Sequence, residues 1–294
     1  MRRLRALEPL AWVGPAVVLI AVVVLWPVVE MIRSSFLQIS RVGIVRGFNG
    51  LDNYNKLFAE KDFADVMVRS VIWVVAVVAL TVLISLALAQ LFNQRFPGRK
   101  VARWALIAPW AASVLMTAIV FKWMLDPEVG VINQIRLKLG LIDAMGGASA
   151  DQLGDASTAM PWLVFVAVFV SVPFTTYALL AGLATIPTDV YEAAKMDGAS
   201  WIRTYWSITL PLLRPALTVA ALINVMNVFN SFPIIWAMTH GQPGYSTATS
   251  TILMFILKGS DIGESAAMSV VNFGMVLVIT ALFLKISRWN RAVA

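Results

Sequence analysis

The sequence predicts an all-α polytopic membrane protein with six transmembrane helices, and this prediction rests on composition and charge spacing. Of the 294 residues, 60% are hydrophobic and 13% are charged, whereas an ordinary soluble domain has about 25% charged residues. About 20 helical residues cross a bilayer core of roughly 30 Å, so each long uncharged run can hold a span. Six such runs occur, at residues 10–29, 70–94, 104–121, 156–188, 215–257 and 265–284.

The first run follows Arg2, Arg3 and Arg5, which is also how a secretory signal begins. Its apolar stretch is longer than that of a signal peptide, and no small-residue cleavage pattern follows it. We therefore expect a retained helix. The outer segment that follows is rich in turn-forming residues and ends in a short surface helix, expected at residues 53–58.

The second and third runs are joined by a short basic segment at residues 93–103. The outer loop before the fourth run predicts a short amphipathic helix at 131–139, followed by a stretch rich in Gly, Ala and Ser at 144–159 that we expect to be mobile. The fifth run is long enough for two crossings, but its residues 239–250 are too polar for lipid. We therefore predict one crossing there and six in all.

The distribution of charge predicts that both termini are cytoplasmic. With the N-terminus inside, the inner segments hold 13 Lys and Arg against four acidic residues, and the outer segments hold 10 against 12. This asymmetry follows the positive-inside rule. The chain is then divided into residues 1–65 (cytoplasmic N-terminus, first span and first outer loop), 66–288 (a transmembrane domain of five helices with a loop at 187–211) and 289–294 (a cytoplasmic tail).

Several kinds of chemistry have no support in the sequence. It has no cysteine, no glycine-rich loop for nucleotide phosphates and no catalytic triad or acid pair, and its single histidine, His240, has no second metal ligand beside it. We therefore predict no enzymatic activity and no metal or cofactor bound by this chain. A basic cluster, Arg95, Arg99, Lys100 and Arg103, lies between two spans, so we expect membrane lipid rather than nucleic acid as its partner.

The loop at residues 187–211 carries the most informative pattern. Pro187 and Thr188 can start a helix, and Gly198 can end it by adopting a left-handed conformation. A second short helix is expected at 199–208. Small side chains and an acid in the first helix allow a partner to approach closely and offer it a charge, although an ordinary amphipathic connector on the membrane surface can have the same composition.

Seven residues of this loop reproduce the pattern E-A-A-x3-G-x9-I-x-L-P: Glu192, Ala193, Ala194, Gly198, Ile208, Leu210 and Pro211. In this pattern the chain resembles the inner-membrane permease subunits of binding-protein-dependent ABC importers. The resemblance implies a type I ABC importer permease fold, a bacterial or archaeal plasma-membrane location, and docking of Glu192, Ala193, Ala194 and Gly198 on a cytoplasmic ATPase. The implied partners are a second permease, two ATPase copies that bind ATP and Mg, and an extracytoplasmic solute-binding protein.

Three further stretches, at 50–54, 130–133 and 238–243, are similar to those of sugar permeases of the maltose and glycerol-phosphate type. The last stretch departs from the family's L-T-x-G-G-P at Met238 and Gln242. The resemblance therefore implies a sugar or related polyol as substrate and leaves its identity open.

Polar side chains within a span are costly unless they face protein or water, so they mark a candidate substrate path. In the fifth span, Asn224, Asn227 and Asn230 are spaced i, i+3 and i+6 and fall on one helix face. Amides donate and accept hydrogen bonds, which suits a neutral sugar. Thr176 and Tyr177 of the fourth span are candidates to complete the site. The same residue types also join helix to helix within membranes.

We predict a membrane permease subunit that forms, with the second permease, the pathway for a sugar or polyol. No Arg or Lys lies in the fourth and fifth uncharged runs, which favours a neutral solute over the alternative of a phosphorylated polyol or other small solute. A secondary transporter would need acids within its spans, and the sole candidate is Glu30, at the edge of one. A membrane assembly scaffold is a third alternative, and it predicts no ATP-dependent flux.

Overall fold

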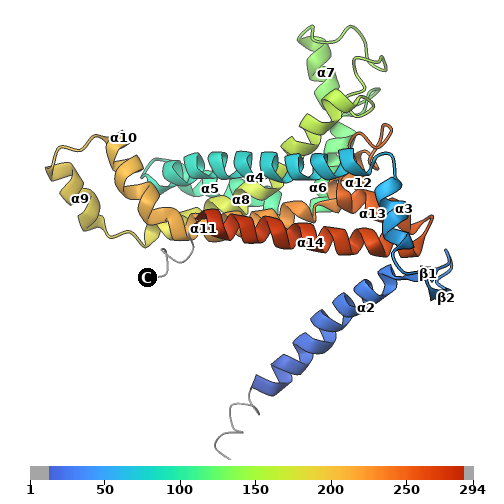
Figure 1. Cartoon of the computed structure of the whole chain (residues 1–294). Helices are drawn as coiled ribbons and strands as arrows, with labels where there is room; N and C mark the ends of the chain where they lie inside the picture. Colours follow the sequence, from blue (N-terminus) through green and yellow to red (C-terminus); the bar gives the residue numbers. More distant parts are fainter. Residues whose placement is uncertain (1–12, 288–294) are drawn as a thin grey trace, which may run out of the picture. The chain divides into compact units, whose positions relative to one another are not determined.

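The computed structural model describes residues 13–287, so residues 1–12 and the predicted tail at 289–294 lie outside the described part. The described chain forms two compact units, the smaller with residues 13–64 and 253–275 and the larger with residues 65–252 and 276–287. Figure 1 shows their elements. In chain order these are η1 (Ala21–Leu25, a π-helical turn), α2 (Trp26–Ser35), β1 (Leu37–Ile39), β2 (Val45–Phe48), α3 (Asp52–Ala59), α4 (Phe63–Asn93), α5 (Arg99–Ala111), α6 (Val114–Met124), α7 (Val131–Lys138), α8 (Ala156–Ala184), α9 (Thr188–Met196), α10 (Trp201–Thr204), η2 (Tyr205–Thr209, a second π-helical turn), α11 (Leu210–Phe229), α12 (Phe232–Met238), α13 (Ser250–Lys258) and α14 (Ile262–Ser287).

Five of the described helices are long and apolar enough to cross a membrane. They are Val13–Ser34, Phe63–Asn93, Ala156–Ala184, Trp201–Phe229 and Ile262–Lys285. A sixth crossing is obtained when the bent pair α5 and α6 counts as one span, so each of the six uncharged runs corresponds to a helix or a helix pair. The long fifth run contains one such helix, as predicted, followed by the short helices α12 and α13.

The third predicted span is a broken helix. α5 and α6 meet at an angle of 96°, because Ala112 and Ser113 between them have extended backbones with ψ of 147° and 137°. Pro109, in the last turn of α5, has no N–H group to donate within the helix. Residues 104–121 therefore have the composition of one span but follow a sharply bent path.

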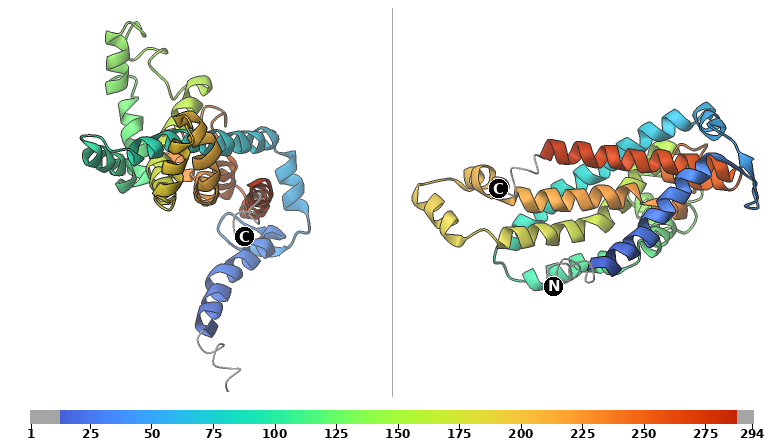
Figure 2. Two further views of the ribbon diagram at one scale, coloured as in Figure 1. Left: turned by 90° about the vertical axis from the view of Figure 1, so that its left-hand side faces the viewer. Right: turned by 60° about the horizontal axis from the view of Figure 1, so that its bottom comes forward.

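The core of the larger unit is the contact between α8 and α11, which lie side by side (Figure 2). A Cβ atom at Gly182 of α8 would collide with the Cβ of Ala216 in α11, so this approach requires glycine. Ala216 also packs against a cluster of buried apolar residues: Ala89, Leu179, Leu183, Ile186 and Leu213. Because lipid is as apolar as these side chains, close van der Waals contact holds the two helices together within a membrane.

The first turns of α4 brace the far end of α11. The indole N–H of Trp73 donates hydrogen bonds to the carbonyl oxygen of Val228 and to Oγ of Ser231, at 3.1 and 2.9 Å. Nη1 of Arg69 donates to the carbonyl oxygen of Tyr245 at 2.8 Å. These bonds fix the point where α11 ends and the polar loop after α12 folds back.

The loop before α8 contains α7, as predicted from the amphipathic pattern. Asn133 of α7 is buried, and its Nδ2 donates to the carbonyl oxygens of Leu125, Asp126 and Ala150 at 3.1, 3.0 and 2.9 Å. One amide thus joins α7 to the segments on either side of it.

Part of the stretch at 144–159, which is expected to be mobile, is helical instead. α8 begins at Ala156 because Asp155 caps it: Oδ1 of Asp155 accepts hydrogen bonds from the backbone N–H and the hydroxyl of Ser157, at 2.8 and 3.0 Å. These hydrogen bonds lower the pKa of the exposed Asp155 carboxyl.

The smaller unit holds the only β-strands among the described residues, which is a departure from the all-helical prediction. β1 and β2 pair antiparallel, with Leu37 opposite Phe48. α3 then forms where the surface helix at 53–58 is predicted. Asn53 is 1% exposed, and its Nδ2 donates to the carbonyl oxygens of Ser35 and Leu37 at 2.8 and 2.9 Å. Its side chain therefore ties α3 to the end of α2 and the start of the hairpin.

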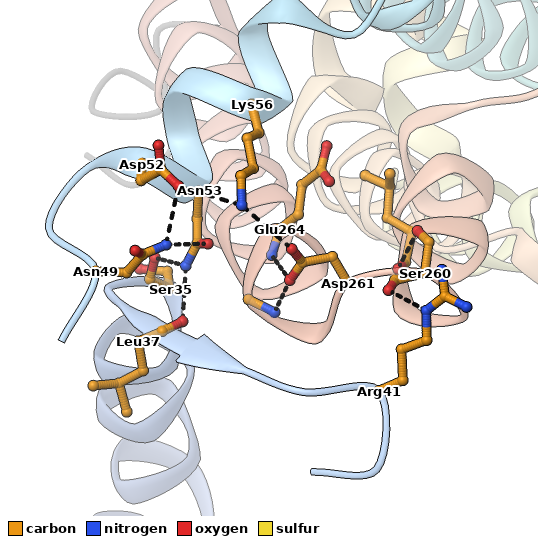
Figure 3. Close-up of polar contacts among 12 residues, drawn as sticks. Ser35, Leu37, Arg41, Asn49, Asp52, Asn53, Lys56, Ser260, Asp261 and Glu264 are labelled. Atoms are coloured by element: carbon orange, nitrogen blue, oxygen red, sulfur yellow. Dashed lines mark hydrogen bonds and ion pairs between the residues drawn. The ribbon is translucent and has the colours of Figure 1, made fainter. Parts of the chain in front are cut away.

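Figure 3 shows that α3 also contacts the segment before α14. Nζ of Lys56 lies 3.3 Å from Oδ2 of Asp52 and 3.7 Å from Oδ2 of Asp261. The contact with Asp52, together with the nearby negative charges, raises the pKa of Lys56. Oδ1 of Asp261 accepts hydrogen bonds from the backbone N–H groups of Gly263 and Glu264, so this carboxylate also caps α14.

Candidate functional site

The loop between the fourth and fifth spans begins with α9, which ends just before Gly198, as predicted. Gly198 has a left-handed backbone, with φ of 71°. Its N–H and that of Ala199 donate to the carbonyl oxygens of Lys195 and Ala194, at 3.1 and 3.0 Å. This pair of bonds forms a Schellman motif, in which a left-handed residue lets the last carbonyls of a helix be satisfied.

The pattern residues of α9 are presented differently to a partner. Glu192, Ala193 and Gly198 are exposed, whereas Ala194 is 6% exposed. Ala194 lines a small cleft of about 200 Å³ between α9 and the start of the next helix. The cleft is lined by Ala194, Asp197, Ala199, Arg203, Thr204, Ser207 and Ile208. A partner can reach Glu192, Ala193 and Gly198 directly, and Ala194 only by way of this cleft.

Helix forms over most of the predicted stretch at 199–208, beginning at Trp201, and it leads into the fifth span without a break. α10, η2 and α11 form one continuous helix, which Ser200 starts by accepting a hydrogen bond on Oγ from the N–H of Arg203, at 3.4 Å. The π-helical turn η2 lies near Pro211. Because Pro211 has no N–H and its ring crowds the carbonyl of Ser207, a regular α-helical turn is disfavoured at this point. The loop is therefore joined to the fifth span by helix rather than by a hinge.

Asn224 of α11 is buried and contacts the neighbouring span. Its Nδ2 donates a hydrogen bond to Oγ1 of Thr175 on α8, at 2.5 Å. This hydrogen bond joins two helices, which is the alternative to substrate binding that the sequence analysis gave for these amides. A contact between Asn224 and substrate stays a prediction.

Asn227 and Asn230 are exposed. The Asn227 amide has no hydrogen-bond partner in the described part of the chain, and Nδ2 of Asn230 donates to the carbonyl oxygen of Met226 at 3.2 Å. α11 ends at Phe229, so Asn230 is its C-cap rather than a member of the predicted helical face. The helix stops because Pro233 has no N–H to donate to the carbonyl of Phe229.

The two candidates on α8 lie in different surroundings. Thr176 is fully buried, and its Oγ1 has no hydrogen-bond partner among the described residues. The hydroxyl of Tyr177 donates to the carbonyl oxygen of Arg103 on α5, at 2.9 Å. Tyr177 therefore joins α8 to α5, and contacts of either residue with substrate stay predictions.

An aromatic group on α6 and α8 is absent from the sequence-based candidates. The ring of Phe121 lies edge-on to those of Phe165 and Phe169, with centroids 5.8 and 5.3 Å apart, and Trp162 lies 5.7 Å from Phe165. Phe165 and Phe169 are 49% and 37% exposed. The spacing i, i+3 and i+7 of the three residues on α8 was the available signal, because it places them on one helix face.

The stretch at 238–243 forms a tight turn held by threonine side chains. Oγ1 of Thr239 lies 2.9 Å from Oγ1 of Thr247, and Oγ1 of Thr247 donates to the carbonyl oxygen of Gln242 at 2.8 Å. His240 is exposed. Within residues 13–287, no group of three His, Cys, Asp or Glu side chains could hold a metal ion.

Comparison with known proteins adds independent information. Residues 81–292 match the family described as binding-protein-dependent transport system inner membrane component. A probable ABC transporter permease protein of Brucella suis is 40% identical over 275 residues, which cover 93% of this chain and 94% of that protein. The trehalose/maltose transport system permease protein MalF of Thermococcus litoralis is 34% identical over 245 residues, covering 83% and 81%. A solved bacterial ABC transporter involved in the import of the acidic polysaccharide alginate has the same fold, with a TM-score of 0.82 and 19% identity over 98% of this chain and 99% of that chain.

Proposed function

Because the chain belongs to the family of binding-protein-dependent transport system inner membrane components, and so is a permease subunit of an ABC importer rather than an enzyme, we propose that it forms part of the membrane pathway for a neutral sugar or polyol. In this family ATP binds a separate ATPase subunit. The proposal extends the family assignment to a class of substrate and to the residues that contact it.

The observation that carries this proposal is the exposed amide of Asn227 in the apolar helix α11. An amide without a partner in hydrocarbon costs about 2 kcal/mol or more, so this side chain is best accommodated beside water, substrate or another subunit. Asn230 is exposed at the end of the same helix. The stacked rings of Phe232 and Trp236, with centroids 5.6 Å apart, follow it. Amides beside aromatic rings suit the hydroxyls and the apolar face of a sugar.

The absence of positive charge along this part of the chain favours a neutral solute. Neither α8 nor the part of α11 after Arg214 contains Lys or Arg. A phosphorylated polyol or other anion would therefore receive no counter-charge from these helices, and burying an unpaired anion is costly. The trehalose/maltose relative, which is named for neutral sugars, also supports this choice.

We also propose that α9 docks on the ATPase through Glu192, Ala193, Ala194 and Gly198. The charge asymmetry of the sequence supports an orientation with α9 and both termini in the cytoplasm. The complete importer would then contain a second permease, two ATPase copies that bind ATP and Mg, and an extracytoplasmic binding protein that delivers the solute.

Asn227→Ala and Asn230→Ala test the pathway in the reconstituted importer. Each substitution removes about 0.5 to 1.5 kcal/mol of hydrogen bonding to a sugar, which corresponds to a roughly 2- to 12-fold lower apparent affinity. Assembly and thermal stability should be unchanged. Asn55→Ala, which removes an exposed amide on α3, is the matched control and should transport normally.

The measurement is transport per assembled complex, in a background that hydrolyses ATP without the binding protein, because that protein can mask the affinity of the membrane cavity. Unchanged transport and substrate preference in the double variant would remove the proposed site. A transport loss that only follows the amount of intact complex would instead show that these amides join subunits or helices.

A further inference from the structure

The turn between α4 and α5 concentrates positive charge that no acidic side chain among the described residues neutralises. Four cations lie close together in sequence: Arg95, Arg99, Lys100 and Arg103. None of them belongs to an ion pair within residues 13–287, and the sequence has no acidic residue from position 66 to position 125. The loop at 187–214, by contrast, has three cations and three acids.

These four cations have different surroundings. Nη2 of Arg103 donates to the carbonyl oxygen of Phe92 at 2.6 Å, so Arg103 caps the end of α4. Nη1 of Arg99 donates to the carbonyl oxygen of Gln94 at 3.2 Å, and its other N–H groups remain available. Arg95 and Lys100 are exposed. Three positive charges at this turn can therefore receive an anion.

Apolar side chains lie directly beside these charges. Val101 and Trp104 of α5 are each 73% exposed. Trp104 follows Lys100 by one helical turn, or about 6 Å of rise, and tryptophan is enriched at the boundary between bilayer and water. An acidic protein surface would account for the cations but would leave Val101 and Trp104 unexplained. A phospholipid accounts for both, because it has a phosphate beside an acyl chain.

We propose that Arg95, Arg99 and Lys100 bind the phosphate headgroup of an anionic phospholipid whose acyl chain lies against Val101 and Trp104. The site rests on the proposed function only in requiring that α4 and α5 meet at a membrane surface, and its chemistry is the same for any transported solute. Each cation near an anionic membrane surface strengthens binding about fivefold, so the three together contribute roughly 100-fold.

The test uses the full-length chain, purified with its partner subunits in neutral detergent. Binding of phosphatidylglycerol and of phosphatidylcholine is measured by native mass spectrometry and by the rise in unfolding temperature. The variant is R95Q/R99Q/K100Q. The matched control is R46Q/K61Q/K138Q, which removes the same charge from exposed cations elsewhere in the chain, in β2, before α4 and at the end of α7.

Wild type and control should bind phosphatidylglycerol in preference to phosphatidylcholine, and the variant should lose roughly 100-fold in phosphatidylglycerol affinity while unfolding at the wild-type temperature in phosphatidylcholine. Undiminished phosphatidylglycerol binding by the variant, or an equal loss in the control, would overturn the proposal.

Equal stabilisation by inorganic phosphate alone would replace the lipid with a free anion. Loss of the ATPase subunit from the variant already in phosphatidylcholine would reassign the cluster to a protein contact. Sugar transport is not a readout, so failure here is separable from failure of the proposed function.

Discussion

Asn224 on α11 donates a hydrogen bond through Nδ2 to Oγ1 of Thr175 on α8, and both residues are buried. The two helices also approach closely at Gly182, where a larger residue would not fit. Two independent contacts therefore hold these spans at one relative height. Asn224 and Asn227 therefore have different surroundings although both lie on α11: Asn224 is buried and hydrogen-bonded to α8, whereas Asn227 is exposed.

The first prediction concerns this bond. Asn224→Leu and Thr175→Val should each destabilise the purified complex, and the double variant should show a coupling of about 0.6 kcal/mol, the average for hydrogen bonds between membrane helices. Unfolding in a denaturing detergent measures these differences. Asn227→Leu is the control and should leave stability unchanged. Strictly additive effects at positions 224 and 175 would contradict the assignment.

The second prediction concerns coupling to the ATPase. Gly198→Val places a β-branched side chain at φ of 71°, which costs about 1 to 2 kcal/mol, and Glu192→Lys reverses an exposed charge. Both variants should insert normally but lose transport and substrate-stimulated ATP hydrolysis. Gly198→Asn is the control, because asparagine tolerates this conformation better. Wild-type transport by both Gly198→Val and Glu192→Lys would show that α9 is only a connector.

Membrane orientation gives the third prediction. The chain has no cysteine, so single cysteines can be introduced at the exposed positions Ser149 and Ser200. A maleimide that cannot cross membranes should label position 149 in intact cells and position 200 only after permeabilisation. The reverse pattern would invert the orientation and rule out docking of α9 on a cytoplasmic ATPase.

The fourth prediction is a pH dependence at the start of α8. Hydrogen bonds from Ser157 lower the pKa of Asp155 below its ordinary value of 3.8. The capping contribution is therefore present above that ordinary value and is lost as the pH falls through the lower value of the folded state. Amide exchange of residues 156–160, corrected for intrinsic rates, should accelerate over this acid range.

Asp155→Asn tests whether titration of the carboxylate causes this pH dependence, because the variant keeps a capping side chain but loses the charge. Asparagine also caps helices but does not titrate, so this variant should keep its protection constant over the same pH range, whereas Asp155→Ala should lose protection at every pH. A wild-type pH profile in Asp155→Asn would show that another group controls the start of α8.

The spacing of charged residues predicted which segments form the long apolar helices, because the exclusion of charge from a bilayer leaves a strong signal in sequence. The turn at Gly198 was also predictable, since a left-handed position favours glycine. The break at Ala112 and Ser113 was not, because alanine is the strongest helix former and serine occurs in helices, so neither residue signals an extended backbone. The contrast between Asn224 and Asn227 was also hidden, since spacing does not show which neighbour each amide meets.

The π-helical turn η2 determines how far the α9 loop is rotated about the helix axis relative to the fifth span. A π turn accommodates one residue more than an α-helix would place over the same rise. Deleting one residue within 205–209 would therefore remove the extra residue and leave Trp201 and Asn227 in their present relative positions. Deleting one residue at 217–222 would instead turn Asn227 about 100° around the helix axis relative to Trp201. One residue can thus be removed from this turn without rotating Asn227 about the helix axis relative to Trp201.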